Sequence, residues 1–148
     1  MITGFNHTSF TVTDMARAVR FWTEAMGFTA ASVAPRSGAW QATVTGVAGA
    51  GLLIAHLHGH GVHIELIQYV DGAAAPRRIE PNMAGAAHVC FEVSDIRKTW
   101  DRLMAAGAAP QGEITTVVDG PVQGLDAAYL RDPEGILIEL VELPPSAG

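Results

Sequence analysis

The stretch HTSFTVTD, residues 7–14, returns later in the chain as HVCFEVSD, residues 88–95, an offset of 88 − 7 = 81 residues. The triplet IEL also occurs twice, at residues 64–66 and 138–140, with an offset of 139 − 65 = 74 between its glutamates. An internal repeat of this length indicates that one supersecondary unit occurs twice. The repeated positions include two histidines and two glutamates, side chains that suit a divalent metal.

Composition restricts the class of protein. The chain has 148 residues, 49% hydrophobic and 16% charged, which supports one domain or two half-domains that share a core. The net charge of −6 argues against nucleic acid and anionic membranes as partners. Cys90 is the single cysteine and cannot form an internal disulfide, and no apolar stretch is long enough to span a bilayer. We therefore expect a cytoplasmic protein.

Each half begins with an alternating strand and an amphipathic helix. The strands are expected over residues 5–13 and 86–93. Asp14 is a suitable N-cap for the first helix, and Ser94 or Asp95 for the second. Glycines are expected to end the two helices, at Gly27 and Gly107.

Short β-rich stretches follow each helix. The predicted strands are residues 29–33, 40–47, 52–57 and 62–69 in the first half, and 112–118, 127–130 and 136–143 in the second. The sequence DPEG at residues 132–135 fits a type I turn. We expect a first βαβββ module over residues 1–70, a connecting segment over 71–85 and a second module over 86–148. One module would leave an apolar sheet face uncovered, which gives a physical reason for the duplication.

Four residues form a candidate metal site. If the first and last strands of each half are neighbours, His7 approaches Glu65, and His88 approaches Glu139. Two imidazoles and two carboxylates without a thiolate suit one divalent ion, either Ni²⁺, Co²⁺, Zn²⁺, Fe²⁺ or Mn²⁺. A single histidine on a strand is usually an ordinary polar residue, but recurrence at equivalent points of both halves favours ligands.

These stretches resemble the vicinal oxygen chelate (VOC) superfamily, which includes glyoxalase I, methylmalonyl-CoA epimerase, extradiol dioxygenases and bleomycin- or fosfomycin-resistance proteins. The resemblance rests on HTSFTV (7–12), GF (27–28), IEL (64–66), GAAHV (85–89) and DPEGILIEL (132–140). It implies an α+β fold in which tandem βαβββ modules form a cupped mixed β-sheet with helices on the outside. It also implies a metal held by His7, Glu65, His88 and Glu139, and a homodimer.

The resemblance implies a reaction class more clearly than a substrate. Glu65 matches the glyoxalase I-like enzymes, whereas IQYV at residues 67–70 departs from the stretch that follows this glutamate in glyoxalase I. Residues 88–96 and 135–142 look more like the epimerases. We expect a metal-dependent lyase or isomerase that removes a proton next to a carbonyl of a small molecule, with Glu139 or Glu65 as both ligand and base.

Two alternatives stay open. An extradiol-type non-haem Fe(II) dioxygenase would use only His7, His88 and Glu139. An antibiotic- or other small-molecule-binding resistance protein would bind its ligand without turnover and would need no metal.

Further residues are candidates for substrate contacts. His63 lies two residues before Glu65, Trp40 lies outside both predicted helices, and Arg77 and Arg78 suit a substrate carboxylate or phosphate, with surface solvation as the ordinary alternative. The alternating residues His56, His58 and His60 are interpreted as a solvated edge or loop, with adventitious metal binding as the alternative.

Overall fold

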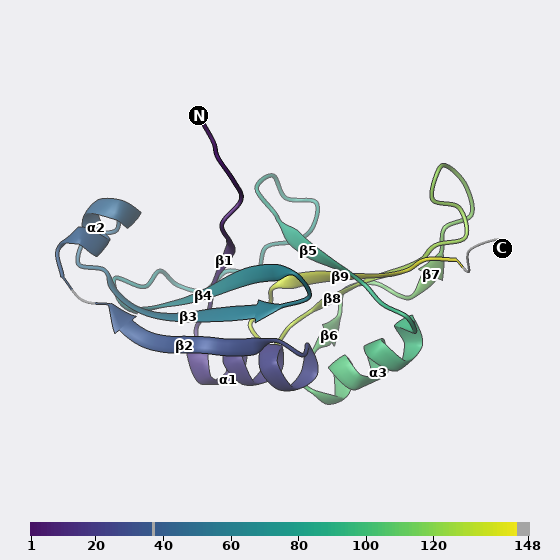
Figure 1. Cartoon of the computed structure of the whole chain (residues 1–148), viewed down its shortest axis with the longest axis horizontal. Helices are drawn as coiled ribbons and strands as arrows, with labels where there is room; N and C mark the ends of the chain where they lie inside the picture. The colour runs from purple at the N-terminus through teal and green to yellow at the C-terminus, as the bar shows by residue number, and fades with distance from the viewer. Residues whose placement is uncertain (37, 145–148) are drawn as a thin grey trace. The chain divides into compact units, whose positions relative to one another are not determined.

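The computed structural model describes residues 1–36 and 38–144 (Figure 1). The chain divides into two compact units, Met1–Arg77 (unit 1) and Arg78–Gly148 (unit 2). Each unit contains one mixed β-sheet and repeats the order strand, helix, strands. The expected α+β class with tandem βαβββ order is therefore confirmed. Within the described residues, no helix has the length and apolar character needed to cross a bilayer.

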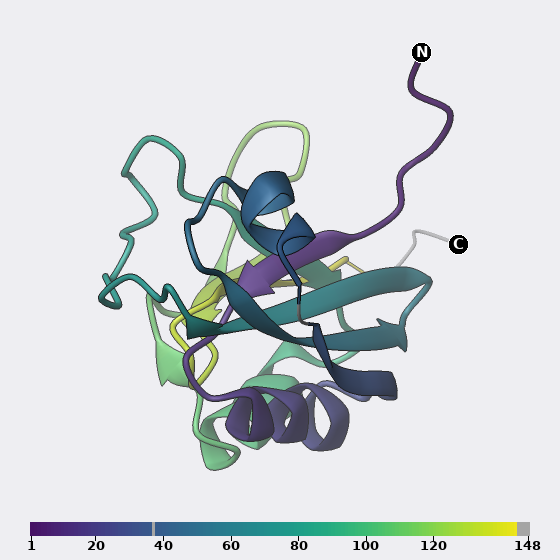
Figure 2. The ribbon, with the colours of Figure 1, turned by 90° about the vertical axis from the view of Figure 1, so that its left-hand side faces the viewer.

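Unit 1 contains a four-stranded sheet in the order β1-β4-β3-β2. Its elements are β1 (Thr8–Thr11), α1 (Met15–Arg20), the π-helical turn η1 (Phe21–Ala25), β2 (Thr29–Arg36), α2 (Trp40–Thr45), β3 (Gly51–Gly59) and β4 (Val62–Asp71). Strand β1 runs parallel to β4, and the other neighbours are antiparallel. Figures 1 and 2 show α1 and α2 on opposite sides of this sheet.

The core of unit 1 lies between the sheet and the α1–η1 helix. Alternation along β4 buries Ile64 and Leu66 on the face that α1 covers, and turns Glu65 to the other face. Trp22 is fully buried in this core, and its ring packs against Phe28 at a centroid distance of 5.4 Å. Because this face is apolar and covered, the opposite face of β4 is left for polar side chains.

Unit 2 contains a sheet in the order β5-β9-β8-β6, with β7 also paired to β8. Its elements are β5 (His88–Glu92), α3 (Ile96–Ala105), β6 (Ala109–Pro110), β7 (Thr115–Thr116), β8 (Asp126–Arg131) and β9 (Leu137–Glu142). Strands β5 and β9 are parallel, as β1 and β4 are in unit 1. Helix α3 packs against β9, and the fully buried side chains of this unit are Ile96, Leu103, Leu130, Ile138 and Leu140.

The repeat extends to individual hydrogen bonds. In unit 1 the backbone N–H of Met15 at the start of α1 donates to Gln68 Oε1 of β4, at 2.8 Å. In unit 2 the backbone N–H of Ile96 at the start of α3 donates to Glu142 Oε2 of β9, at 2.7 Å. These donors and acceptors stand 81 and 74 residues apart (96 − 15 and 142 − 68), the offsets found in the sequence. A side chain from the last strand therefore anchors the helix in each unit.

The capping residues and the turn agree with the sequence. Asp14 and Asp95 each accept a hydrogen bond from the backbone N–H three residues later, which caps α1 and α3. Gly135 N–H donates to the Asp132 carbonyl at 2.9 Å, and Asp132 Oδ1 accepts from the backbone N–H of Glu134 inside the predicted 132–135 turn and from that of Ile136 just after it.

Two predicted strands are wrong in whole or in part. Residues 40–47 contain helix α2 rather than a strand, because Gly46 takes a left-handed conformation (φ 71°) and donates to the Ala42 carbonyl, which closes the helix. Of residues 112–118, only Thr115–Thr116 form a strand. The alternation of threonine and valine favoured strands in sequence, but short-range helix capping decides the conformation of residues 40–45.

Candidate metal and substrate site

The first His–Glu pair lies on the sheet of unit 1. His7 immediately precedes β1, Glu65 lies in β4, and His7 Nε2 is 3.5 Å from Glu65 Oε2. On the other side of the ring, His7 Nδ1 is 2.7 Å from Asn6 Oδ1. An amide oxygen only accepts, so Nδ1 donates to Asn6 Oδ1, and Nε2 is the ring nitrogen that lies on the Glu65 side. This is the arrangement in which a histidine binds a metal through one nitrogen and is oriented through the other.

Three further histidines lie beside this pair. His56 of β3 is directly opposite Glu65, with Nδ1 3.8 Å from Glu65 Oε1 and 3.1 Å from His63 Nε2. His58 stacks on His63, with ring centroids 4.3 Å apart. We call His7, His56, His58, His63 and Glu65 the histidine cluster. The predicted edge position is wrong for His56 and His58, because β3 lies between β2 and β4 inside the sheet, although His58 is exposed as expected.

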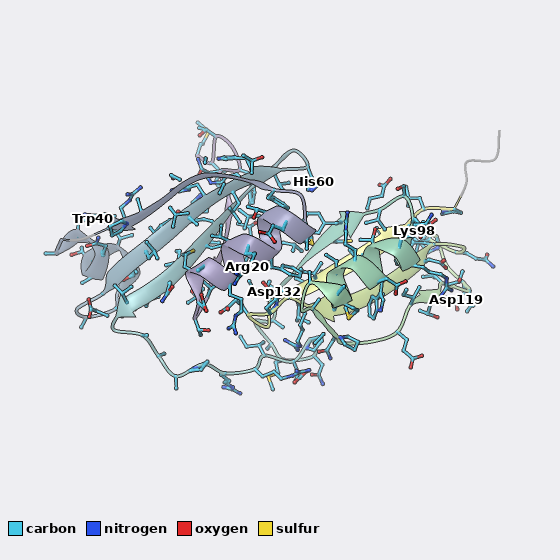
Figure 3. All side chains as sticks on the ribbon, turned by 90° about the horizontal axis from the view of Figure 1, so that it is seen from below. Arg20, Trp40, His60, Lys98, Asp119 and Asp132 are labelled. Carbon is cyan, nitrogen blue, oxygen red and sulfur yellow. The ribbon has the colours of Figure 1, made fainter. Side chains whose placement is uncertain are left out.

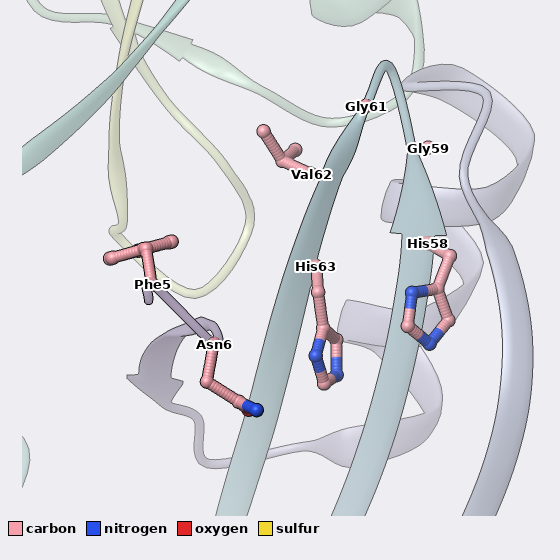
Figure 4. A pocket seen from close by; sticks show the side chains of 7 residues that line it. All are labelled: Phe5, Asn6, His58, Gly59, Gly61, Val62 and His63. Carbon is pink, nitrogen blue, oxygen red and sulfur yellow. The ribbon is translucent and has the colours of Figure 1, made fainter. Parts of the chain in front are cut away.

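An open pocket of about 380 Å³ adjoins the cluster (Figure 4). Its lining residues are Phe5, Asn6, His58, Gly59, Gly61, Val62 and His63. Figure 4 shows the His58 ring on β3 beside the His63 ring on β4. Burial lowers the pKa of His63, and the neighbouring His58, His56 and His7 lower it further, so this imidazole is neutral at pH 7. His63, expected to contact substrate, therefore lies in a pocket beside the candidate ligands.

The second His–Glu pair lies on the sheet of unit 2. His88 Nε2 of β5 is 3.0 Å from Glu139 Oε2 of β9. Tyr129 of β8 is directly opposite Glu139, and its hydroxyl donates to Glu139 Oε2 at 3.2 Å and lies 3.2 Å from His88 Nε2. Tyr129 thus occupies in unit 2 the cross-strand position that His56 occupies in unit 1. Tyr129 was not predicted as part of a site, and His56 was considered only for adventitious metal binding.

Two side chains that keep their protons, Cys90 and Tyr129, lie beside Glu139. Burial raises the pKa of the Cys90 thiol to about 11, and the negative charge of Glu139 adds to this effect. Burial also raises the pKa of Tyr129, again with a contribution from Glu139. Both side chains therefore keep their protons at neutral pH, and Tyr129 can act as a donor to the carboxylate. The position of Cys90 opposite Glu139 in the β5–β9 pair explains this coupling.

The other predicted substrate contacts lie apart from the pocket of unit 1 or carry their own partners. Trp40 begins α2 and is 53% exposed, and Figure 3 shows it at the other end of the sheet from the turn at His60. Arg77 is exposed. Arg78 pairs with Glu80 at 2.5 Å and donates to Gln111 at 3.0 Å. Their role in substrate binding stays a prediction.

Arg131, a buried arginine that the sequence did not single out, connects several segments of unit 2 through hydrogen bonds. Arg131 at the end of β8 is only 3% exposed and pairs with Glu80 at 3.1 Å. Its guanidinium also donates to Gln111 Oε1 and to the carbonyls of Gly135 and Ile79. Residues 79 and 80 belong to the segment before β5, so Arg131 ties this segment to β8. No sequence signal distinguishes Arg131 from a surface arginine.

The resemblance implies a divalent metal, and the two His–Glu pairs are the donors that the chain offers to it. Within the described residues, no group of three or more His, Cys, Asp or Glu side chains is arranged to hold a metal ion. Each unit by itself instead brings its predicted histidine close to its predicted glutamate, and unit 1 adds His56 Nδ1 at 3.8 Å from Glu65 Oε1. Neutral imidazole and carboxylate suit the divalent ions named from the sequence. The chemistry of the residues therefore fits such an ion.

Comparisons with known proteins extend these observations. Residues 4–140 match the sequence profile of the Glyoxalase/Bleomycin resistance protein/Dioxygenase superfamily. A 2-epi-5-epi-valiolone epimerase from Actinomyces is 34% identical over 151 aligned positions, covering 96% of this chain and 80% of that protein.

Two solved structures show the likeness in three dimensions. A glyoxalase family protein from Bacillus cereus is 30% identical, with 97% of each chain covered and a TM-score of 0.83. The fosfomycin resistance protein FosX from Listeria monocytogenes, solved with Mn(II) and a sulfate ion, is 15% identical with 98% of this chain and 96% of that chain covered. Its TM-score of 0.62 shows a likeness of fold.

Proposed function

The chain belongs to the Glyoxalase/Bleomycin resistance protein/Dioxygenase superfamily, and from that premise we propose that it is a divalent-metal-dependent isomerase or lyase. The proposed reaction is removal of a proton from a carbon next to a carbonyl group. The observation that carries the proposal is the His–Glu pair found at equivalent places in both units, at 3.5 Å in unit 1 and 3.0 Å in unit 2. A duplicated core alone needs no such pair.

Epimerisation is the form of this reaction that we favour. The Actinomyces relative, 34% identical, is named as an epimerase. An epimerase inverts the configuration at one carbon, and loss and return of a proton next to a carbonyl achieves this inversion. The lyase reaction of glyoxalase I begins with the same proton removal, so both activities make the same demand on the site.

The metal ligands in this proposal are the two His–Glu pairs, His7 with Glu65 and His88 with Glu139. Asn6 orients His7 through Nδ1, and Tyr129 holds Glu139 through Oε2. When bound, a divalent ion polarises the carbonyl oxygen as a Lewis acid and stabilises negative charge on it. Manganese in FosX is an example of such an ion in a protein of the same fold.

Glu65 and Glu139 are the proposed proton-transfer residues. Inversion requires one group that removes the proton and another that returns it on the opposite face of the carbon. Glu65 has two imidazoles at 3.5 and 3.8 Å, both beyond hydrogen-bond distance, so its carboxylate oxygens remain able to accept a proton. Glu139 Oε2 accepts from the Tyr129 hydroxyl, which holds this carboxylate in place for the proposed proton transfer.

Solvent deuterium exchange tests the proposal. We expect the metal-loaded protein to place deuterium next to the carbonyl of 2-epi-5-epi-valiolone, methylmalonyl-CoA or the methylglyoxal–glutathione hemithioacetal. Glu65→Gln and Glu139→Gln should each slow exchange by about 10²- to 10⁴-fold. Glu24→Gln, an exposed carboxylate on η1, is the matched control and should leave the rate unchanged. Full turnover and full metal content in both site variants would refute the proposal.

The two alternative activities give different outcomes in the same samples. A dioxygenase would consume oxygen with a catechol when loaded with Fe²⁺, and Glu65→Gln would keep this activity because that enzyme needs only His7, His88 and Glu139. A resistance protein would bind an antibiotic tightly without metal and without turnover. Either result, in the absence of deuterium exchange, would replace the proposed isomerase.

We also propose a cytoplasmic homodimer. The single cysteine suits a reducing compartment, and the dimer follows from the resemblance to the superfamily. Cell fractionation and light scattering of the purified chain test these two points independently of the activity.

A further inference from the structure

We propose that helix α2 is a lid over an apolar subsite beside Glu65, and that Trp40 rotates inward on this lid to cover a hydrocarbon chain of the substrate. The substrate class is therefore a carbonyl compound that carries such a chain. The position of the reacting carbon at Glu65 rests on the proposed function, whereas the lid and the subsite rest on the side chains of α2 and of the sheet below it.

The polarity of α2 is the reverse of that expected for a helix packed on a protein surface. Its fully buried residue is a glutamine, Gln41, whereas Trp40 and Val44 are 53% and 75% exposed. Trp40 and Val44 are four residues apart and therefore share one face of the helix. A surface helix normally buries its apolar face. In the observed position, which we call the resting position, α2 leaves its apolar face in water.

The buried amide of Gln41 destabilises the resting position. Among the described residues, neither Gln41 Oε1 nor Gln41 Nε2 has a hydrogen-bond partner. A polar group that is buried without a partner loses its hydration and gains no bond in exchange, so the arrangement costs free energy. Two backbone hydrogen bonds of this segment are also long, since Gln41 N–H to the Gly38 carbonyl and Thr43 N–H to the Ala39 carbonyl both measure 3.4 Å.

Rotation of α2 about its own axis relieves both defects. Successive residues of a helix point about 100° apart, so a rotation through this angle exposes Gln41 to water and brings Trp40 to the inward side. Glycines at the two ends, Gly38 and Gly46, allow the rotation because glycine changes φ at little steric cost. Apart from chain neighbours, no described atom lies within 4 Å of the place where a Cβ at Gly46 would be.

Helix α2 adjoins the sheet face that carries Glu65. Figures 1 and 2 show α2 on the opposite side of the unit 1 sheet from α1, the helix from which Glu65 points away. Val47, just after α2, packs against a buried cluster that includes Leu52 and Ile54 of β3. Ile54 and His56 share one face of β3, and His56 is directly opposite Glu65. The lid and the proposed proton-transfer residue therefore lie on the same face.

The apolar subsite begins next to Glu65 along the sheet. The cross-strand pair Ile54–Ile67 lies two residues from Glu65, or about 7 Å, and the pair Leu52–Tyr69 lies two residues further. Ile67 and Tyr69 are only partly buried, so part of their surface is open to a ligand. None of these four side chains carries a charge. A hydrocarbon chain attached to the reacting carbonyl group therefore lies along them, below Trp40 of the rotated lid.

¹⁹F NMR of the full chain tests the rotation. The probe is 2-hexanone, a methyl ketone with a four-carbon chain, added to Zn²⁺-loaded protein that contains 5-fluorotryptophan. The Trp40 resonance, identified by its loss in Trp40→Phe, should shift in a saturable way. The Trp22 resonance should stay in place, because Trp22 is fully buried in the core on the α1 face. Acetone, which has no chain, should move neither. A Trp40 resonance that 2-hexanone leaves in place, or that acetone moves equally, would overturn the proposal.

Gln41→Met separates an amide without a partner from one that a buried water satisfies. Methionine fills a similar space and has no donor that needs a partner, so the variant should melt about 2–6 °C higher and hold α2 in the resting position. Binding of 2-hexanone should weaken about five- to fiftyfold. Gln123→Met, at an exposed glutamine, is the matched control and should change neither quantity. A lower melting temperature in Gln41→Met would show that the amide is satisfied at rest, and the lid would then be rejected.

Trp40→Ala tests the contact with the hydrocarbon chain. Because Trp40 is exposed in the resting position, its truncation should change the melting temperature by less than about 2 °C. Binding of 2-hexanone should nevertheless weaken about tenfold, since the indole no longer covers the chain. Val118→Ala, at an exposed valine of unit 2, should change neither quantity. Equal affinity of Trp40→Ala and the unmodified protein would exclude Trp40 from the subsite and contradict the lid.

Deuterium exchange tells failure of the lid from failure of the proposed function. Exchange next to the carbonyl at the same kcat/KM for 2-hexanone and acetone, unaffected by Trp40→Ala, would leave the reaction standing and remove the lid. A saturable shift of the Trp40 resonance, without exchange into any carbonyl compound, would leave the lid and its subsite standing as a binding site and remove the reaction.

Discussion

The two units share a backbone plan but differ in the residue that faces the glutamate. Parallel pairing of the first and last strands, the helix anchored from the last strand, and the His–Glu pair occur in both. Opposite the glutamate, however, unit 1 has His56 and unit 2 has Tyr129. The position of the pair therefore depends on the shared parallel strands, whereas its chemical surroundings depend on the next strand, which is free to differ.

The two units also differ in the residues that form their cores. Unit 1 is built around aromatic rings on η1 and the adjoining strands, with Trp22 packed against Phe10, Phe21 and Phe28. Unit 2 is built around aliphatic side chains and the buried Arg131 network. Core substitutions in unit 1 should therefore change stability through apolar packing. Core substitutions in unit 2 should change stability partly through polar contacts.

The largest expected effect is on the aromatic core of unit 1. Trp22→Ala should lower the free energy of unfolding by about 3–5 kcal/mol, because Trp22 is fully buried and its removal leaves a cavity. Trp100→Ala on α3 should cost less, about 1–2 kcal/mol, because Trp100 is only partly buried. Urea unfolding of both variants measures the difference. Equal losses would show that the two helices are packed alike.

The next effect is on the polar core of unit 2. Arg131→Ala should cost about 3 kcal/mol, because Glu80, Gln111 and two carbonyls lose their buried donor. Arg20→Ala, an exposed arginine at the end of α1, is the control and should change stability by less than about 0.5 kcal/mol. Thermal unfolding provides the measurement. A small effect at Arg131 would mean that water replaces its contacts.

The residues opposite the glutamates allow a direct comparison of the units. Tyr129→Phe should weaken divalent-metal binding about 10- to 100-fold, since it removes the hydroxyl that orients Glu139. His56→Phe should weaken it less, because His56 Nδ1 is 3.8 Å from Glu65, beyond hydrogen-bond distance. Competition with a chromophoric chelator gives both affinities. The reverse order would assign the orienting role to unit 1.

The smallest effect concerns the cap of α3. The Lys98 ammonium and backbone N–H hydrogen-bond Asp95 and lower its pKa below the ordinary value. Because the folded-state pKa is depressed, this stabilisation is present above the ordinary aspartate pKa of about 3.9 and is lost as the pH falls through the folded value. Asp95→Asn should therefore melt slightly lower at pH 7 and lose less melting temperature between pH 5 and pH 3. In Lys98→Ala the acid-induced loss should also shrink, and an unchanged loss in both variants would contradict this assignment.

Some features of the site were readable in the sequence. Strand alternation placed Glu65 and Glu139 on the face away from the buried Ile and Leu neighbours, and the structure has this alternation. The approach of His7 to Glu65 and of His88 to Glu139 required a further assumption, that the first and last strands of each half are neighbours. The structure has this pairing in both units. The roles of these residues as ligands and bases stay predictions.

Other features of the site could not be predicted from the sequence. His56 and Tyr129 face the glutamates only because of antiparallel register, which the turns set. The turn at His60 and Gly61, with φ angles of 52° and 75°, places His56 opposite Glu65, and a one-residue slip would turn it to the other face. Helix α2 was missed because its β-branched residues favour a strand, while Gly38 and Gly46 at its ends permit the helix.

The sequence by itself determined the duplication, the α+β class, the helix caps and the four candidate ligands, because these depend on local periodicity and on recurrence at fixed offsets. Only the tertiary structure decided which side chains face each carboxylate, that His58 and His63 line a pocket, and that Arg131 is buried. These depend on register and on contacts between segments far apart in the chain. Such contacts have no period along the sequence, so they become visible only when the strands are paired.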